Sequence, residues 1–186
     1  MAVYFFFFFE DFNIEKEIDK LKKGLDKNFL EMSFKTYDNP KFPDLISVLR
    51  SQPMMFGKML VVINCIDYFT KTFDDKQIKE IEGAIENNNE NLDIAFVAAL
   101  PRDGGKKLDS RKKFFKILAK QNSKECASIP TYKTAELEDW VKKSAKSKSL
   151  KINPDAAAAL VSQVGNNLRQ LDGELDKLAL MCYPDK

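Results

Sequence analysis

The sequence predicts an α/β domain with a mostly parallel sheet, followed by a small all-helical domain. Three apolar runs do not alternate with polar residues, which is typical of parallel strands buried on both faces. These runs cover residues 3–9, 59–63 and 94–100. Helical patterns separate them, and alternating strands and helices predict parallel pairing with right-handed crossovers. We assign residues 1–133 to the α/β domain and 134–186, where only helical patterns remain, to the helical domain.

The elements between the first two apolar runs follow from capping and spacing signals. Asn13 is a candidate N-cap for a helix over residues 14–25, where isoleucine and leucine recur at helical spacing. Residues 29–37 are predicted to form a strand. Pro43 suits the first turn of a helix that continues to Arg50.

The rest of the α/β domain is predicted in the same way. Residues 64–74 favour a loop with some turn, and residues 76–87 favour a helix with one isoleucine stripe. A basic helix with inward-facing apolar residues is expected over residues 110–121. Residues 126–129 are predicted to form a short last strand.

The helical domain is predicted to contain three helices. The first carries Leu137, and a Lys/Ser-rich connection is expected over residues 142–151. Asn153, followed by proline, starts the second helix, and Gly165 ends it. Asn167 can cap the third helix. That helix carries leucines at helical spacing (Leu168, Leu171, Leu175 and Leu178).

The composition removes several classes of chemistry. The 186 residues include no histidine, the commonest general base and metal ligand. Cys65, Cys126 and Cys182 form no C-x-x-C pair, so we expect no zinc or redox motif and a reducing, cytoplasmic location. The net charge of +2 argues against a chain that coats nucleic acid with its whole surface. We expect no metal and no cofactor.

No segment is predicted to cross or enter a membrane. A transmembrane helix needs about 20 apolar residues, and the chain has no such run. The first apolar run lacks a preceding basic region and is followed at once by Glu10 and Asp11, unlike a signal peptide.

The first strand-to-helix turn disfavours nucleotide binding. An α/β domain with a helical appendage suggests a nucleotide-binding protein, whose phosphates would sit at this turn. The turn lacks glycine and lysine and carries Glu10 and Asp11, which would repel a triphosphate. Asp67 is a candidate magnesium ligand, although an ordinary turn aspartate is the simpler interpretation. We therefore expect neither ATP binding nor intrinsic catalysis.

An apolar triplet follows the helix breaker Pro53. Met54, Met55 and Phe56 stand between this proline and Gly57, just before an apolar strand. Large apolar residues at such a tip mark a binding surface when they are exposed, and Met and aromatic residues are common interface anchors. Alternatively, they cap the local core.

Basic residues concentrate between positions 102 and 124. This stretch holds nine Lys or Arg residues against two aspartates. A helix face that carries these basic residues can contact DNA phosphates, although a helix face that is only solvated is the simpler interpretation. The candidate DNA contacts are Arg111, Lys112, Lys113 and Lys116.

Several motifs resemble one known family. They are the opening Val3-Tyr-Phe-Phe-Phe with the later Glu10-Asp-Phe-Asn-Ile-Glu, the stretch Leu108-Asp-Ser-Arg-Lys-Lys, and the stretch Val164-Gly-Asn-Asn-Leu-Arg-Gln-Leu-Asp-Gly-Glu-Leu. Their order and spacing are similar to those of the delta subunit of the bacterial DNA polymerase III clamp loader. The family often has Gly-Glu where Phe8 and Phe9 stand, and Arg where Met59 stands.

The resemblance implies an AAA+ fold: a three-layer α/β domain with a degenerate nucleotide site, followed by a helical lid domain. It implies a third, collar domain, which would begin near Lys186 and is expected to be absent from this chain. It implies a subunit of the DNA polymerase holoenzyme that binds and opens the sliding clamp (beta). Met54, Met55 and Phe56 match the ring-opening element, in which two adjacent large apolar residues are usual.

The implied partners are the clamp, the gamma/tau and delta-prime subunits, and primed DNA within the assembled complex. Two other functions stay open. One is a nucleotide-binding AAA+ ATPase, and the other is a DNA-binding module that uses the basic stretch. A delta-prime or gamma/tau subunit is disfavoured, because such relatives carry a Cys-rich zinc module.

Overall fold

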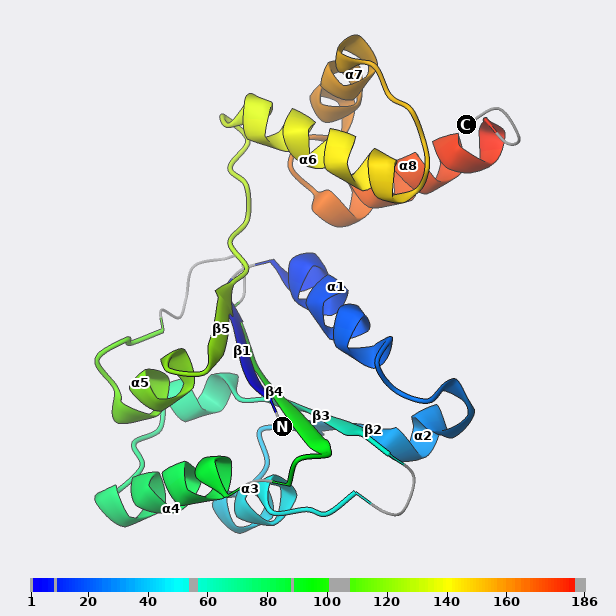
Figure 1. Cartoon of the computed structure of the whole chain (residues 1–186). Coiled ribbons are helices and arrows are strands. Elements are labelled where there is room, and N and C mark those ends of the chain that lie inside the picture. Colours follow the sequence, from blue (N-terminus) through cyan, green and yellow to red (C-terminus); the bar gives the residue numbers. More distant parts are fainter. Residues whose placement is uncertain (1, 9, 54–56, 88, 101–107, 183–186) are drawn as a thin grey trace. The chain divides into compact units, whose positions relative to one another are not determined.

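The structure is a computed structural model that describes most of the chain (Figure 1). The described residues are 2–8, 10–53, 57–87, 89–100 and 108–182. The chain divides into two compact units, residues 1–127 and 128–186. The sequence placed this boundary between residues 133 and 134, so the connecting residues before the first helix of the second unit group with that unit.

The first unit is built on a five-stranded sheet with the order β2-β3-β4-β1-β5. Every neighbouring pair is parallel, which confirms the predicted fold class. The strands are β1 (Val3–Phe8), β2 (Phe34–Asp38), β3 (Met59–Asn64), β4 (Leu92–Ala99) and β5 (Asn122–Glu125).

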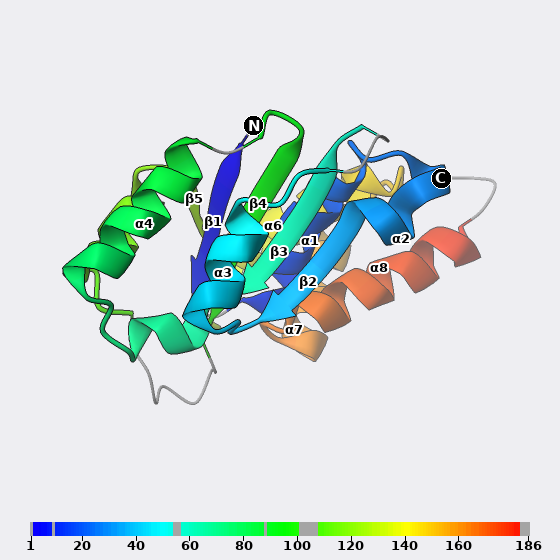
Figure 2. The ribbon, with the colours of Figure 1, turned by 90° about the horizontal axis from the view of Figure 1, so that it is seen from below.

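Helices cover both faces of this sheet (Figures 1 and 2). One face packs against α1 (Asp11–Lys22), and the other packs against α3, α4 and α5. The remaining helical elements of this unit are η1 (Lys27–Phe29), α2 (Leu30–Ser33), α3 (Phe42–Leu49), η2 (Ile66–Phe69), α4 (Asp75–Glu86) and α5 (Lys113–Ala119).

The two covered faces explain the unbroken apolar run of β1. Successive side chains of a strand point to opposite faces. Phe5 accordingly joins the core below α3, α4 and α5, whereas Phe6 joins the core below α1. The Phe5 ring stacks on Phe7 and meets Phe69 and Phe115, with ring centroids 4.8–5.9 Å apart. A strand in which apolar and polar residues alternate would have left one of these two cores without its aromatic residues.

The predicted strand over residues 29–37 is wrong in its first half. Residues 27–33 form η1 and α2, and only Phe34–Asp38 is extended. The Asp26 carboxylate accepts a hydrogen bond from the Asn28 backbone N–H at 2.9 Å, which caps η1. The Ser33 hydroxyl donates to the Phe29 carbonyl at 2.8 Å. These local hydrogen bonds stabilise a helical backbone over residues 27–33, although the apolar residues there favour a strand.

Three boundaries at α1, α5 and β5 also differ from the predictions. Helix α1 begins at Asp11 with Glu10 at the N-cap position, so Asn13 lies inside it. Helix α5 is shorter than the predicted 110–121. The last strand covers Asn122–Glu125, instead of 126–129, and its polar residues are exposed. It is a strand because its backbone pairs with β1, and not because of its side chains.

The second unit contains α6 (Thr134–Ser147), α7 (Pro154–Val164) and α8 (Leu168–Met181). The predicted starts of α7 and α8 are confirmed, including the Asn167 cap. Asn153 accepts from the Ala156 N–H at 2.7 Å, and Asn167 accepts from the Gln170 N–H at 3.2 Å. Gly165 follows α7 with a φ of 77°, which glycine adopts most readily. The predicted connection over residues 142–151 is wrong, because α6 continues into it.

A polar cluster joins α6 to α8 beside their apolar contact. The Asp172 carboxylate accepts from the Ser144 hydroxyl at 2.6 Å and pairs with the Lys148 ammonium at 3.1 Å. Lys148 also pairs with Asp176. Burial lowers the pKa of Lys148, but its hydrogen bonds to Asp176 and Asp172 outweigh burial and leave the pKa raised.

Helix α1 is attached to the β5 edge by an ion pair that predicts a pH effect. The Glu17 carboxylate accepts from Lys124 on β5 and from Lys20, both at 2.7 Å. Burial raises the pKa of Glu17, but the two lysines outweigh it, so the pKa lies below the usual 4.5. A lowered folded-state pKa stabilises the protein above pH 4.5, and this contribution disappears as the pH falls through the folded pKa.

We expect Glu17→Gln to lose about 1 kcal/mol or less of unfolding free energy at pH 7, because the pair is partly exposed. As the pH falls below 4.5 and through the lowered folded-state pKa of Glu17, the difference between the variant and the parent should shrink and disappear. Urea unfolding from pH 7 to pH 3 measures both. A difference that stays constant over this range would contradict the assignment to the ionised carboxylate.

Candidate functional site

The turn between β1 and α1 occupies the place where a nucleotide phosphate would lie in a related α/β fold. Within its described part, Glu10 is 1% exposed and its backbone N–H donates to the Cys126 carbonyl at 3.1 Å. Asp11 lies in the first turn of α1. Helix N-termini favour anions, and here two carboxylates of the chain already stand at this end. The turn is therefore unfavourable for a triphosphate.

Asp67 belongs to a network that stabilises the turn after β3. Its backbone N–H donates to the Asn39 side chain at 2.9 Å, and its carbonyl accepts from the Thr70 hydroxyl at 2.8 Å. Asn39 has a φ of 43°, in the left-handed region. In the part of the chain that the structure describes, no group of three or more Cys, Asp or Glu side chains is arranged to hold a metal ion. These contacts favour the turn interpretation of Asp67 over the magnesium one.

The predicted clamp-binding residues Met54, Met55 and Phe56 lie outside the described residues. The segments on either side of them are well anchored. Helix α3 precedes them, with Leu45 and Leu49 fully buried. After them, Gly57 has a φ of 86°, and the Met59 N–H donates to the Asn91 carbonyl at 2.8 Å as β3 begins. A side chain at position 57 would be strained in this conformation.

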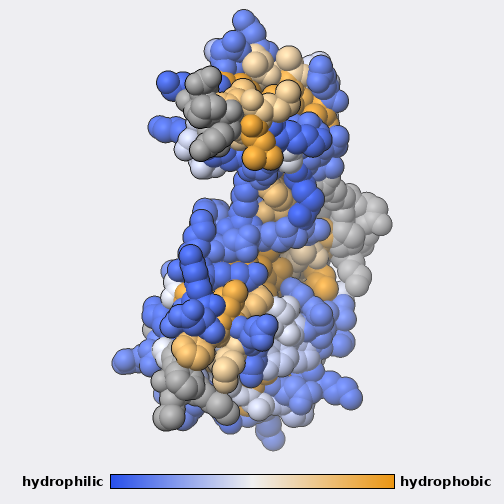
Figure 3. All heavy atoms as spheres, turned by 90° about the vertical axis from the view of Figure 1, so that its right-hand side faces the viewer, coloured by the Kyte–Doolittle hydropathy of each residue, from blue (hydrophilic) through white to orange (hydrophobic). Residues whose placement is uncertain are grey.

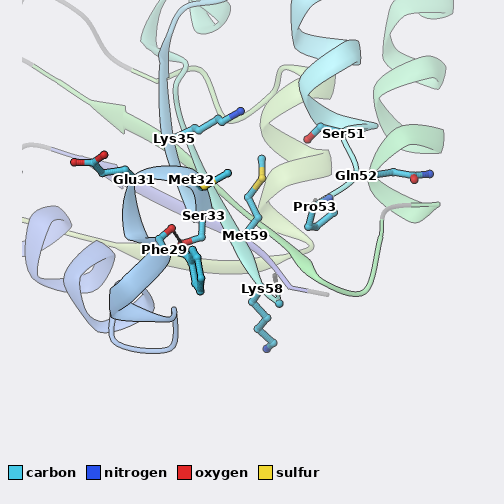
Figure 4. Close-up of a pocket in the computed structure, with 11 residues that line it drawn as sticks. Phe29, Glu31, Met32, Ser33, Lys35, Ser51, Gln52, Pro53, Lys58 and Met59 are labelled. Carbon is cyan, nitrogen blue, oxygen red and sulfur yellow. Dashed lines mark hydrogen bonds between the residues drawn. The ribbon is translucent and has the colours of Figure 1, made fainter. Parts of the chain in front are cut away.

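A pocket of about 410 Å³ lies beside these two anchoring segments (Figure 4). Its walls come from η1, α2 and the start of β2 on one side, and from the segments before and after the triplet on the other. Its lining residues are Phe29, Glu31, Met32, Ser33, Lys35, Ser51, Gln52, Pro53, Gly57, Lys58 and Met59. Phe29 and Met32 remain 36% and 55% exposed. Figure 3 shows apolar residues reaching the surface on one side of the molecule.

Sequence reasoning did not find this pocket. Its walls come from segments that are separated along the chain, and their proximity depends on the pairing of β2 with β3. The predicted strand over residues 29–37 also gave no reason for Phe29 and Met32 to stay exposed. The one available signal was local: the capping aspartate Asp26, which starts η1.

Most of the predicted DNA-contacting residues already bind acceptors on the protein. Arg111 forms two hydrogen bonds with the Asp109 carboxylate, at 3.0 and 3.2 Å. Lys113 pairs with Asp75, and Lys112 donates to the Lys71 carbonyl at 2.9 Å. These side chains are solvent-accessible, and their hydrogen bonds hold the pKa values of Asp75 and Asp109 below the usual range.

Their placement differs from the predicted single helix face. Helix α5 begins at Lys113, with Lys112 at its N-cap position, so Arg111 precedes the helix. Lys116 lies on the helix and is exposed. Residues 101–107 of the basic stretch lie outside the described residues.

The comparisons with known proteins point to DNA replication. A family model described as DNA polymerase III, delta subunit, matches residues 4–127. The structure of the Bacillus subtilis DNA clamp loader delta protein is similar with a TM-score of 0.77 at 21% identity, over 99% of this chain and 54% of that chain. At this identity the likeness shows the fold alone.

A second solved structure, described as a DNA replication initiation factor, has a TM-score of 0.40 at 10% identity, over 96% of this chain and 55% of that chain. The chain thus spans about half the length of the solved structures that it matches. No curated protein matches the chain.

Proposed function

Because the chain belongs to the DNA polymerase III delta subunit family, we propose that it binds the sliding clamp and opens the clamp ring during DNA replication. The observation that carries this proposal is the family match over residues 4–127, which includes the apolar triplet. The proposed partners are the clamp, the gamma/tau and delta-prime subunits, and primed DNA in the assembled complex. The proposed location is the cytoplasm.

Met55 and Phe56 serve as anchors that enter an apolar pocket of the clamp, with Met54 beside them. Full burial of each side chain contributes roughly 1.5–3 kcal/mol. The buried helix α3 and strand β3 support this proposal, because the segments on either side of the triplet are already ordered before binding and lose less conformational entropy. Binding alone does not open a ring. The chain opens the clamp only to the extent that it binds the open form more tightly than the closed form.

This function does not require nucleotide hydrolysis by the chain. Glu10 and Asp11 at the start of α1 make the turn unfavourable for a triphosphate, so ATP-driven steps belong to partner subunits. The competing function, an AAA+ ATPase, predicts nucleotide-dependent thermal stabilisation of the isolated chain.

Among the described helices, none has the length and apolarity that crossing a bilayer requires.

Arg111, Lys112, Lys113 and Lys116 remain the proposed contacts to primed DNA within the complex. The ion pairs of Arg111 with Asp109 and of Lys113 with Asp75 are exposed, and exposed ion pairs contribute little free energy, so phosphates can replace these two carboxylates. A DNA-binding module that works alone would instead show strongly salt-dependent DNA affinity in the isolated chain.

We expect the double variant Met55→Ala/Phe56→Ala to weaken clamp binding by about 2 kcal/mol or more, or about 30-fold in Kd. The reason is the loss of both apolar anchors. The measurement is titration with the purified clamp of the same organism. Leu180→Ala/Met181→Ala is the matched control, since these apolar side chains are 76% and 80% exposed at the end of α8. Unchanged affinity in a folded Met55/Phe56 variant would reject the proposal.

A further inference from the structure

A lysine-rich segment at the end of α6 has no role in the function proposed above. Residues 140–154 contain five lysines and no aspartate or glutamate. One of these lysines, Lys148, is neutralised by its ion pairs with Asp172 and Asp176. Lys146 and Lys151 are exposed, and neither forms an ion pair with a residue that the structure describes. Positive charge that the protein does not use internally therefore remains at this end of the helix.

The turn that starts the loop from α6 to α7 brings these lysines to one pocket (Figure 1). Ser149 has a φ of 59°, in the left-handed region. Its backbone N–H donates to the Lys146 carbonyl at 3.1 Å, and the Leu150 N–H donates to the Ala145 carbonyl at 3.0 Å. These two hydrogen bonds form the Schellman pattern, which ends a helix and redirects the chain. Lys151 lies beyond the helix and consequently lines the same pocket as Lys146.

This pocket has a volume of about 430 Å³, and its charged lining residues are all lysines. Lys142 lies 3.7 Å from Asp139, but the two side chains are 38% and 66% exposed, and an exposed pair contributes little free energy. No acidic residue is among the described residues that line the pocket. The lining residues are Lys142, Lys146, Ser149, Leu150, Lys151 and Ile152.

The helix end does not prevent an anion from binding here. The last carbonyls of a helix carry partial negative charge, which repels anions. The backbone hydrogen bonds of the turn already occupy the carbonyls of Ala145 and Lys146, and the three lysines add full positive charges. Lysines near a helix C-terminus also stabilise the helix, but that role does not require Lys151, which lies outside it. The pocket therefore fits an anionic ligand.

We propose that this pocket binds phosphates of the primed DNA backbone. Lys142 and Lys146 are one helical turn apart, which separates their Cβ atoms by about 5–6 Å, and such a row of cations suits the successive charges of a polyanion. Among the described lining residues none is aromatic, so the contact is to the backbone and not to stacked bases. The inference rests on the proposed function, and it gives the helical unit a DNA contact separate from residues 111–116.

The test measures the affinity of the assembled clamp-loader complex for primed DNA at several salt concentrations, by fluorescence anisotropy. Lys146→Gln/Lys151→Gln removes the two unpaired lysines and should weaken binding about tenfold at low salt. Each lost phosphate contact lowers the slope of log Kd against log salt concentration by about 0.9, so this slope should fall by about 2. Lys146→Arg/Lys151→Arg keeps the charge and should bind DNA like the parent.

The matched control is Lys23→Gln/Lys27→Gln in the first unit. These two lysines are also exposed and form no ion pair with a described residue, so the change in net charge is the same. The control should change Kd by less than about twofold and leave the salt slope unchanged. Size-exclusion chromatography verifies that each variant enters the complex, and thermal melting verifies that it is folded.

The outcomes separate this inference from the proposed function. If the parent complex binds the clamp and primed DNA, and Lys146→Gln/Lys151→Gln has the same Kd and salt slope, the pocket inference is wrong and the proposed function stands. If the folded variant fails to enter the complex, the pocket contacts a partner subunit, and the inference is also wrong. If the parent chain does not bind the clamp, the proposed function is wrong and the inference falls with it.

Discussion

Phe5→Ala is expected to lower the unfolding free energy of the first unit by about 3–5 kcal/mol. Phe5 is fully buried in the central part of β1, and its ring contacts Phe7, Phe69 and Phe115. Removing it loses the burial of the ring and leaves a cavity that rigid neighbours cannot fill. Because a typical domain is stable by only about 5–15 kcal/mol, this one change removes a large part of the total.

Urea unfolding followed by circular dichroism measures this effect, and the melting temperature should fall by about 10–20 °C. Phe5→Leu is the matched control, because it keeps an apolar side chain of intermediate volume and should cost about 1–2 kcal/mol. A loss below about 1 kcal/mol for Phe5→Ala would mean that the aromatic cluster is not packed as described.

Leu171→Ala is expected to destabilise the second unit by about 2–5 kcal/mol. Leu171 is 0% exposed on α8, between helices that share a small core. A unit formed by α6, α7 and α8 has few other buried leucines, so the loss is large relative to its total stability. The affected unit should unfold at lower urea concentration than the parent.

Leu180 offers a control on the same helix. It has the same side chain and is 76% exposed, so Leu180→Ala should change the unfolding free energy by less than about 0.5 kcal/mol. Amide hydrogen exchange of α6 to α8 reports on this unit separately from the sheet. Equal effects of the two substitutions would contradict the assignment of buried and exposed faces on α8.

The family resemblance and the fold class could be predicted because they depend on long patterns. The apolar runs of β1, β3 and β4 identify a covered parallel sheet, and the family match confirms the resemblance read from the motifs. The caps Asn153 and Asn167 were also predictable, because a capping side chain acts within three residues of its own position.

The failures occurred where structure depends on distant residues. Strand β5 has a polar sequence, and it is extended because β1 offers an open edge, with Tyr4 opposite Asn122. Strand propensity is weak against such context. The prediction for residues 29–33 was wrong in the opposite way. Apolar residues that were expected to form a strand form a short helix, which the hydrogen bonds of Ser33 and Asp26 stabilise.

The candidate site divides in the same way. The apolar triplet at residues 54–56 stays a prediction, which rests on its own chemistry: three large apolar residues between a proline and a glycine. The pocket beside it could not be identified, because Met32 and Lys58 become neighbours only after β2 and β3 pair. A one-dimensional pattern carries no information about which exposed apolar residues share a cavity.

The strand order has a consequence for how the chain is made. Strand β1 is synthesised well before its two hydrogen-bonding neighbours, β4 and β5, which lie much later in the chain. Synthesis at roughly 5–20 residues per second keeps this phenylalanine-rich strand without its partners for several seconds. During that interval its apolar side chains are without the strands that bury them, which makes this part of the chain prone to aggregation.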